Sequence, residues 1–197
     1  MVKAVVGLRN PGLDYVGTRH NVGFEVVEVL CARHGVTLSS GPARVRADVG
    51  DFRLGAARVV LAAPQAFMNE SGRSVASVLS YFKIETDDLL VVHDDIDLPF
   101  GRLKIQFGGG NAGHNGLRSV ERSLGTNEFT RLKVGVGRPP GRMDPAAFVL
   151  RRFSGTEREE IDFLVEDGAD VVEQWVTDPI RAQQTAGSRR PGGPEGS

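Results

Sequence analysis

The chain alternates between short apolar runs and stretches in which apolar residues recur every three or four positions. Short apolar runs are typical of buried strands, and the longer period is typical of amphipathic helices. Strands are therefore predicted at residues 3–8, 44–49, 58–63, 89–95, 103–107 and 131–137. Helices are predicted at residues 21–34, at 114–124, at 157–175, and from 69 or 71 to about 82. This alternation predicts a single α/β domain, with a mixed, twisted sheet covered by helices on both faces.

Composition places the chain among ordinary soluble proteins. Of its 197 residues 40% are hydrophobic and 25% are charged, which is enough apolar chain for one core. We expect the α/β domain to span residues 1–186, and we expect residues 187–197, rich in Gly, Pro and Ser, to be disordered. The longest apolar runs fall well short of the roughly 18 residues of a membrane helix, so no membrane partner is expected. Cys31 is the only cysteine, which excludes an internal disulfide and fits the cytoplasm.

Charge is unevenly distributed along the chain. Residues 98–143 hold eight basic and two acidic residues, whereas residues 154–178 hold nine acidic residues and one basic residue. The basic segment is either a positive face that would suit RNA phosphates or an ordinary solvated face, and both interpretations stay open. Arginine outnumbers lysine by 20 to 4, which suits phosphate recognition and is also compatible with simple composition bias.

Polar residues whose side chains could take part in catalysis or binding fall at the ends of the predicted elements. Asn10 follows the first strand, His20 precedes the first helix, and Asp94 ends the strand at 89–95. Ligands of open α/β sheets bind outside the carboxyl ends of the strands, so Asn10 and Asp94 share a site if their strands are parallel. Taken singly, an asparagine here is more often a helix cap and a histidine a packing residue. The functional interpretation therefore depends on several such residues coming together at one site in the fold.

A glycine-rich loop, GGGNAG (108–113), precedes the helix predicted at 114–124. Gly108, Gly110 and Gly113 match the dinucleotide fingerprint, but the match occurs late in the chain, and no acidic residue ends a following strand at the required distance. The glycines are better explained by a tight turn and a close approach of substrate. Arg118 and Arg122 lie one turn apart on the next helix and, with Lys104, are candidate phosphate-binding residues.

A metallohydrolase is an alternative interpretation. His93, Asp94, Asp95 and Asp97 lie close together in sequence, and His20 and His114 are further possible ligands. Successive side chains of a strand point to opposite faces, however, so residues 93–95 and 97 cannot all face one ion. We therefore predict a site without metal or cofactor.

Four long segments closely resemble bacterial peptidyl-tRNA hydrolases: GLRNPGLDYVGTRHNVGF (7–24), PQAFMNESGRSV (64–75), HDDIDLPFGRLKIQFGGGNAGHNGLRSV (93–120) and RLKVGVGRP (131–139). The resemblance covers about residues 2–180. It implies a cytoplasmic, monomeric enzyme that cleaves the ester between a peptide and tRNA without metal or cofactor. Its partner would be the acceptor stem and 3′ end of a peptidyl-tRNA that left the ribosome prematurely. A tRNA-binding module without hydrolytic activity is the alternative.

The resemblance also implies roles for individual residues. His20 would be the catalytic base, Asp94 the carboxylate that hydrogen-bonds it, and Asn10 the residue that distinguishes peptidyl from aminoacyl esters. The residues that would hold or line the site of the tRNA 3′ end and the peptide are Tyr15, Phe67, Met68, Asn69, His114 and Asn115. These residue types suit ester hydrolysis, because histidine titrates near neutral pH and amides can donate to an oxyanion without carrying charge.

Some positions depart from the family pattern. Arg9 stands where glycine is usual, so it is either strained or adds a cation to the cleft. Gln106 and Lys133 stand where many members carry a basic residue and an arginine, which weakens possible phosphate contacts. Residues 181–197 depart from the family's closing helix. These departures are expected to affect tRNA affinity more than chemistry.

Overall fold

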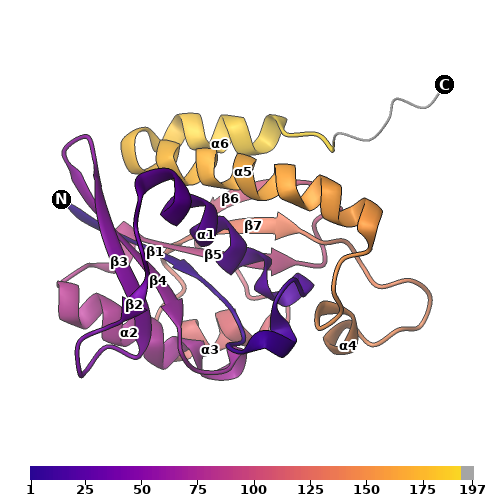
Figure 1. The fold of residues 1–197 in the computed structure, drawn as a ribbon, viewed down its shortest axis with the longest axis horizontal. Coiled ribbons are helices and arrows are strands. Elements are labelled where there is room, and N and C mark those ends of the chain that lie inside the picture. Colours follow the sequence, from indigo (N-terminus) through magenta and orange to yellow (C-terminus); the bar gives the residue numbers. More distant parts are fainter. Residues whose placement is uncertain (192–197) are drawn as a thin grey trace.

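The structure is a computed structural model that describes residues 1–191. Its centre is a seven-stranded sheet in the order β2-β3-β4-β1-β5-β7-β6 (Figure 1). The strands are β1 (Val2–Gly7), β2 (Ser39–Ser40), β3 (Ala47–Leu54), β4 (Ala57–Pro64), β5 (Leu89–Asp95), β6 (Leu103–Phe107) and β7 (Thr130–Gly135). The four central strands β4, β1, β5 and β7 are parallel, and the outer pairs β2–β3, β3–β4 and β6–β7 are antiparallel.

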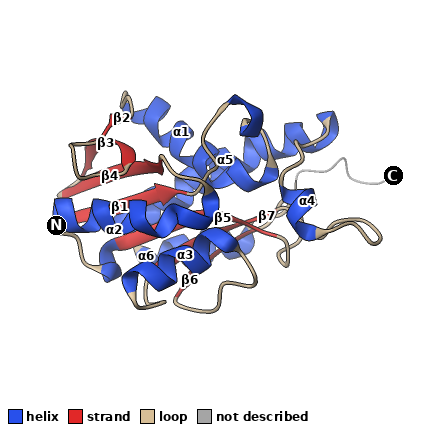
Figure 2. Cartoon of the chain, turned by 90° about the horizontal axis from the view of Figure 1, so that it is seen from below, coloured by secondary structure: helices blue, strands red, loops and turns tan. Residues whose placement is uncertain are grey.

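Helices cover both faces of this sheet. They are α1 (Val22–His34), α2 (Ser71–Phe82), α3 (Asn115–Leu124), α4 (Pro145–Val149), α5 (Gly155–Thr177) and α6 (Pro179–Ser188). Helices α1, α5 and α6 pack on one face, and α2 and α3 pack side by side on the other (Figures 1 and 2). Four short 3-10 turns complete the elements of residues 1–191: η1 (Leu13–Tyr15), η2 (Arg19–Asn21), η3 (Met68–Glu70) and η4 (Thr86–Asp88).

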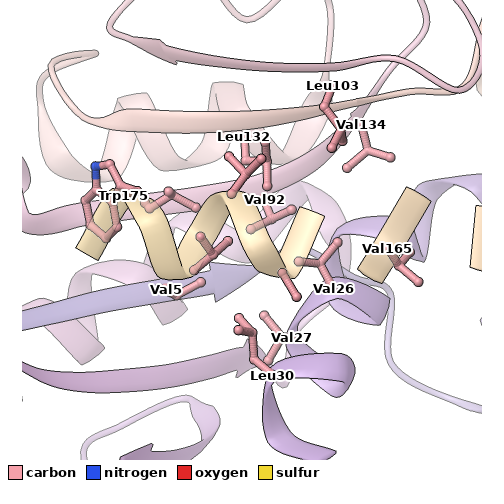
Figure 3. Close-up of a cluster of buried hydrophobic side chains, with 14 of the residues drawn as sticks. Val5, Val26, Val27, Leu30, Val92, Leu103, Leu132, Val134, Val165 and Trp175 are labelled. Atoms are coloured by element: carbon pink, nitrogen blue, oxygen red, sulfur yellow. The ribbon is translucent and has the colours of Figure 1, made fainter. Parts of the chain in front are cut away.

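The hydrophobic core has one layer on each face of the sheet. Because a central strand is buried on both sides, its successive residues supply the two layers in turn. On β1, for example, Val5 packs toward α1 and α5, whereas Ala4 and Val6 pack toward α2 and α3. Figure 3 shows the first layer, where side chains of β1, β5 and β7 meet those of α1 and α5. Burial on both faces explains why these strands are continuous apolar runs in the sequence.

The predicted fold class is confirmed, but several elements differ from their predicted bounds. The strand predicted at 44–49 begins at Ala47 and runs to Leu54, where it forms a long hairpin with β4. Its outer residues are polar and partly exposed, which hid its length in the hydrophobic pattern. The short elements β2 and α4 were not predicted. No helix in the described part of the chain is long and apolar enough to cross a membrane.

The C-terminal segment also differs from expectation. Residues 179–188 form α6, so a helix closes the fold here although the sequence departs from the family pattern, and residues 187 and 188 of the expected tail lie in this helix. Arg189 then donates to Asp167 and to the carbonyl of Gly101, and forms an ion pair with Glu160. These bonds fix the chain just beyond the helix. Residues 192–197 of the predicted tail lie outside the described residues.

The parallel strands bring the candidate residues to one edge of the sheet, because their carboxyl ends coincide there. Asn10 follows β1, and Asp94 lies at the end of the neighbouring β5. A side chain at Gly23 would meet the carbonyl oxygen of Val92 at 2.3 Å, so only glycine lets the start of α1 lie directly on β5. This close approach places His20, in the turn before α1, over Asp94. Helix α4 lies beyond the same edge (Figure 1).

Candidate active site

Two histidines bind one carboxylate oxygen at the centre of this edge. His20 Nδ1 lies 2.8 Å from Asp94 Oδ1, and His114 Nε2 lies 2.9 Å from the same oxygen. Asp94 is 2% exposed, and the two imidazole rings are 4.8 Å apart at an angle of 47°. Three of the predicted site residues, brought from η2, β5 and the start of α3, therefore form one buried cluster.

The surrounding hydrogen bonds determine the tautomers of both rings. His114 caps α3: its Nδ1 accepts from the backbone N–H groups of Gly116 and Leu117 at 3.1 and 3.2 Å. Backbone N–H groups can only donate, so His114 carries its proton on Nε2 and gives it to Asp94. An ionised Asp94 likewise accepts from Nδ1–H of His20. The Nε2 lone pair of neutral His20 is then free, and it has no hydrogen-bond partner among residues 1–191.

Electrostatics favour His20 as a base. Burial acts to lower the pKa of His20, but the charge of Asp94 and the hydrogen bond to it outweigh burial and raise this pKa above its usual value of about 6.5. Burial acts to raise the pKa of Asp94, but His20 and His114 hold this pKa well below its usual range. Asp94 is therefore ionised, and it stabilises the charge that His20 gains on accepting a proton.

His93, next to Asp94 on β5, has a different environment. It is 2% exposed, its Nδ1–H donates to the backbone carbonyl of Asp94 at 2.7 Å, and its ring packs against His114 with centroids 5.0 Å apart. Burial and then the neighbouring His114 lower the pKa of His93 to about 3. His93 is therefore neutral near pH 7 and supports His114 rather than exchanging protons.

Asn10 is held in a defined orientation beside the cluster. Its Oδ1 accepts from the backbone N–H of Met68 at 2.7 Å, and its own backbone N–H and C=O bond to the side chain of Asn21 at 2.8 and 2.9 Å. Because Oδ1 is occupied by a donor, the amide cannot be flipped, and Nδ2 is the group left to donate. No group within residues 1–191 accepts from it.

A cleft of about 450 Å³ opens over these residues. Seven of the predicted site residues line it: Asn10, His20, Met68, Asn69, Asp94, His114 and Asn115. Tyr15 and Phe67 lie outside the cavity, with their rings edge to face and centroids 6.1 Å apart, and Phe67 is 53% exposed. Helix α4 supplies a further part of the lining through Pro145, Ala146 and Val149. The residues predicted to bind the tRNA 3′ end and the peptide or to act in catalysis thus divide into a group that lines the cavity and an aromatic pair outside it.

The family model described as Peptidyl-tRNA hydrolase matches residues 4–191. The chain belongs to the peptidyl-tRNA hydrolase family. It is 53% identical over 180 residues to the peptidyl-tRNA hydrolase of Frankia casuarinae, with 91% of this chain and 90% of that relative covered. It is 51% identical over 172 residues to that of Mycobacterium marinum, with 87% and 90% covered. The crystal structure of peptidyl-tRNA hydrolase from Acinetobacter baumannii matches with a TM-score of 0.89 at 31% identity, covering 96% of both chains. This family membership makes the chain a carboxylic ester hydrolase.

The glycine-rich loop follows β6, an antiparallel edge strand, rather than a strand of a parallel βαβ unit. This position does not fit dinucleotide binding. The loop lines the cleft instead, and it is fixed by Arg131, which is fully buried. Arg131 donates to the carbonyl of Gly110 at 2.6 Å and to Glu121 at 2.9 Å, and Glu121 in turn accepts from Asn111 at 2.7 Å. Sequence analysis missed this role, although a charged residue within an apolar strand was a signal.

The basic segment is less free than its composition suggested. Arg131, Lys133 and Arg138 form ion pairs with Glu121, Asp95 and Asp97, respectively. The three candidate phosphate-binding residues are exposed and lie outside the cleft, Lys104 on β6 and Arg118 and Arg122 on α3. Any phosphate contact of these three would therefore be made on the surface beside the site.

Of the possible metal ligands named from the sequence, His20, Asp94 and His114 present ligand atoms within 4.8 Å of one another. Their hydrogen bonds do not suit a cation. Nδ1 of His114 accepts two backbone hydrogen bonds, so its Nε2 must carry a proton. His114 therefore has no free lone pair on the side that faces Asp94 with which to bind a cation there. The absence of a metal stays a prediction.

The departures from the family pattern find separate structural explanations. Arg9 is neither strained nor in the cleft: positive φ among non-glycine residues 1–191 is confined to Lys83 and Ala112. The Arg9 guanidinium bonds to Asp48 at 2.6 Å and to the carbonyl of Pro64 at 3.0 Å. Lys133 lines the cleft, with Nζ 3.2 Å from Asp95, and Gln106 donates to the carbonyl of Gly108 at 3.3 Å.

Proposed function

We propose that this chain hydrolyses the ester bond between a peptide and tRNA, releasing free tRNA for reuse. The observation that carries the proposal is His20, whose Nδ1–H is bound by Asp94 and whose Nε2 has no partner within residues 1–191 and lies at the cleft, in a chain of this family. A buried histidine held by a carboxylate is the arrangement that a general base near neutral pH requires.

In the proposed reaction, His20 Nε2 takes a proton from water as the water oxygen attacks the ester carbonyl carbon. The bond to the ribose oxygen then breaks, and that oxygen receives the proton back from His20. Asp94 stabilises the imidazolium between these steps. Asn10 Nδ2, which is oriented by the bond from Met68 to Oδ1, donates to the substrate carbonyl and stabilises its developing charge.

His114 has a supporting role in this proposal. Its Nε2–H shares Oδ1 of Asp94 with His20, and its Nδ1 is fixed to the start of α3. His114 therefore connects Asp94 to a rigid helix and fixes the direction in which Asp94 faces His20. It does not need to exchange a proton.

For substrate binding, we propose that the exposed rings of Tyr15 and Phe67 stack on bases of the tRNA 3′ end. Lys104, Arg118 and Arg122 would contact phosphates of the acceptor stem, and Asn69 and Asn115 would bond the peptide backbone inside the cleft. We further propose that the protein acts as a monomer in the cytoplasm, a reducing compartment that suits a chain with a single cysteine.

The test is peptide release from N-acetyl-aminoacyl-tRNA by the purified chain, with free aminoacyl-tRNA as the control substrate. The proposal expects cleavage of the first and little cleavage of the second. Tight binding of both without cleavage would instead indicate a tRNA-binding module. Cleavage of neither, without binding, would refute the proposed function.

A further inference from the structure

The turn that carries His20 is attached to the segment that follows α4. Thr18 pairs with Arg152 in an antiparallel bridge, and the backbone N–H of Arg19 donates to the carbonyl of Arg151 at 3.1 Å. The Arg152 side chain donates a hydrogen bond to the carbonyl of Val16 at 3.0 Å. These contacts span more than 130 positions of sequence, and they connect two loops that would otherwise be independent.

The Arg19 side chain is the centre of this attachment. It is 5% exposed, and its Nη1 donates to the carbonyls of Arg151 and Arg152 at 3.2 and 2.7 Å. Its Nη2 binds both oxygens of Glu157 at 2.7 Å. The planar guanidinium also lies over the rings of Phe148 and Phe153, 4.3 and 4.9 Å from their centroids. Only arginine offers this fork and this flat face together.

Each partner of Arg19 has a second role. Glu157 completes the capping box that begins α5, since Ser154 N–H donates to it at 2.7 Å. Phe148 belongs to α4, which contacts the η2 turn and whose residues Pro145, Ala146 and Val149 line the cleft together with His20. A shift of Arg19 would therefore move the turn of His20, the α4 wall and the start of α5 relative to one another.

We propose that Arg19 is a positioning residue, which locks the His20 turn and the α4 wall into one unit and so sets the distance from His20 to Asp94 and to bound substrate. The inference rests on the proposed function for its catalytic consequence, but the geometry of His20 is measurable without substrate. Displacement of a catalytic group by even about 1 Å costs up to roughly a hundredfold in rate, so such a lock has kinetic value.

The experiment compares wild type with Arg19→Lys, which keeps the charge but not the fork or the flat face. The first readout is the NMR titration of the His20 ring in the free protein. We expect its midpoint to move down toward about 6.5, because a looser bond to Asp94 raises the basicity less. The second readout is kinetic, and we expect kcat to fall about tenfold or more.

Arg33→Lys is the matched control. Arg33 also bridges two helices, from α1 to Glu166 and Asp170 of α5 at 2.6 Å each, but it is remote from the cleft. This variant should leave both the His20 titration and kcat unchanged. If Arg19→Lys does not fold, Glu157→Gln, which keeps the carbonyl bonds of Arg19, should show a smaller change in the same direction.

A folded Arg19→Lys with a lower melting temperature, but with wild-type His20 titration and kcat, would overturn the proposal and leave Arg19 a purely structural residue. Equal effects from Arg33→Lys would overturn it as well. Inactivity of the wild-type protein would instead count against the proposed function, and the titration would still test the lock.

Discussion

Replacing His93 with phenylalanine should make the fold less sensitive to acid. Burial and the nearby His114 lower the pKa of His93 to about 3, against about 6.5 for a histidine in the unfolded chain. Between these two values the unfolded chain binds a proton that the folded chain does not bind. Stability contributed by this group is therefore highest above pH 6.5 and decreases as the pH falls through that window.

The size of the effect follows from the shift. One pKa unit corresponds to about 1.4 kcal/mol, so lowering the pH from 7 to 5 costs wild type roughly 2 kcal/mol of unfolding free energy through His93 alone. His93→Phe cannot take up this proton, although it loses the bond to the Asp94 carbonyl, which costs about 1 kcal/mol at every pH. The gap in stability between the two proteins should therefore narrow or reverse at the lower pH.

Urea unfolding of wild type, His93→Phe and His93→Asn at both pH values measures this gap. The two variants differ in packing and polarity but share the loss of a titrating ring, so their stabilities should show the same changed pH dependence whatever their stability at pH 7. A gap that is equal at both pH values would refute the reasoning, because it would mean that His93 accepts a proton inside the fold.

Three further predictions concern catalysis. Asp94→Asn should lower kcat by about a hundredfold or more with little change in KM. It should also move the acidic limb of the pH–rate profile to lower pH, because Asp94 raises the pKa of His20. A folded variant with near-normal kcat would remove Asp94 from the mechanism. Hydrolysis should survive exhaustive EDTA treatment, and loss of activity that a divalent ion restores would indicate a metallohydrolase. Added salt should raise KM while kcat changes little, and Lys104→Ala should flatten this dependence; a KM insensitive to salt would mean that the exposed basic residues are only solvated.

The fold was predictable because its core strands are buried on both faces and therefore appear as apolar runs. Residues 89–92 of β5 show this most clearly, since all four are apolar and buried. The shortest elements gave no such signal: Ser39–Ser40 is exposed, and Pro145–Val149 is only five residues long. The polar helix α6 was missed because few of its residues face the core.

The site was predictable as a set of residue types but not as a geometry. His20, Asp94 and His114 stand at element ends and match family motifs. That both histidines bond to the same oxygen of Asp94, however, depends on how closely α1 and α3 approach β5. Residues that act through contacts distant in sequence were missed. Arg131 was counted as surface charge, and Arg19 lies in a 3-10 turn that has no periodic pattern. Such roles depend on tertiary contacts.

The central claim is that the free Nε2 of His20 activates water against the ester of a peptidyl-tRNA. Its most direct test is the single-turnover rate of N-acetyl-aminoacyl-tRNA cleavage by wild type and by His20→Gln, at protein concentrations that saturate binding of the substrate to each. We expect wild type to cleave the bound substrate, and we expect His20→Gln to bind it as tightly but to cleave it about a hundredfold or more slowly. Equal cleavage rates, or a wild type that binds and does not cleave, would contradict the claim.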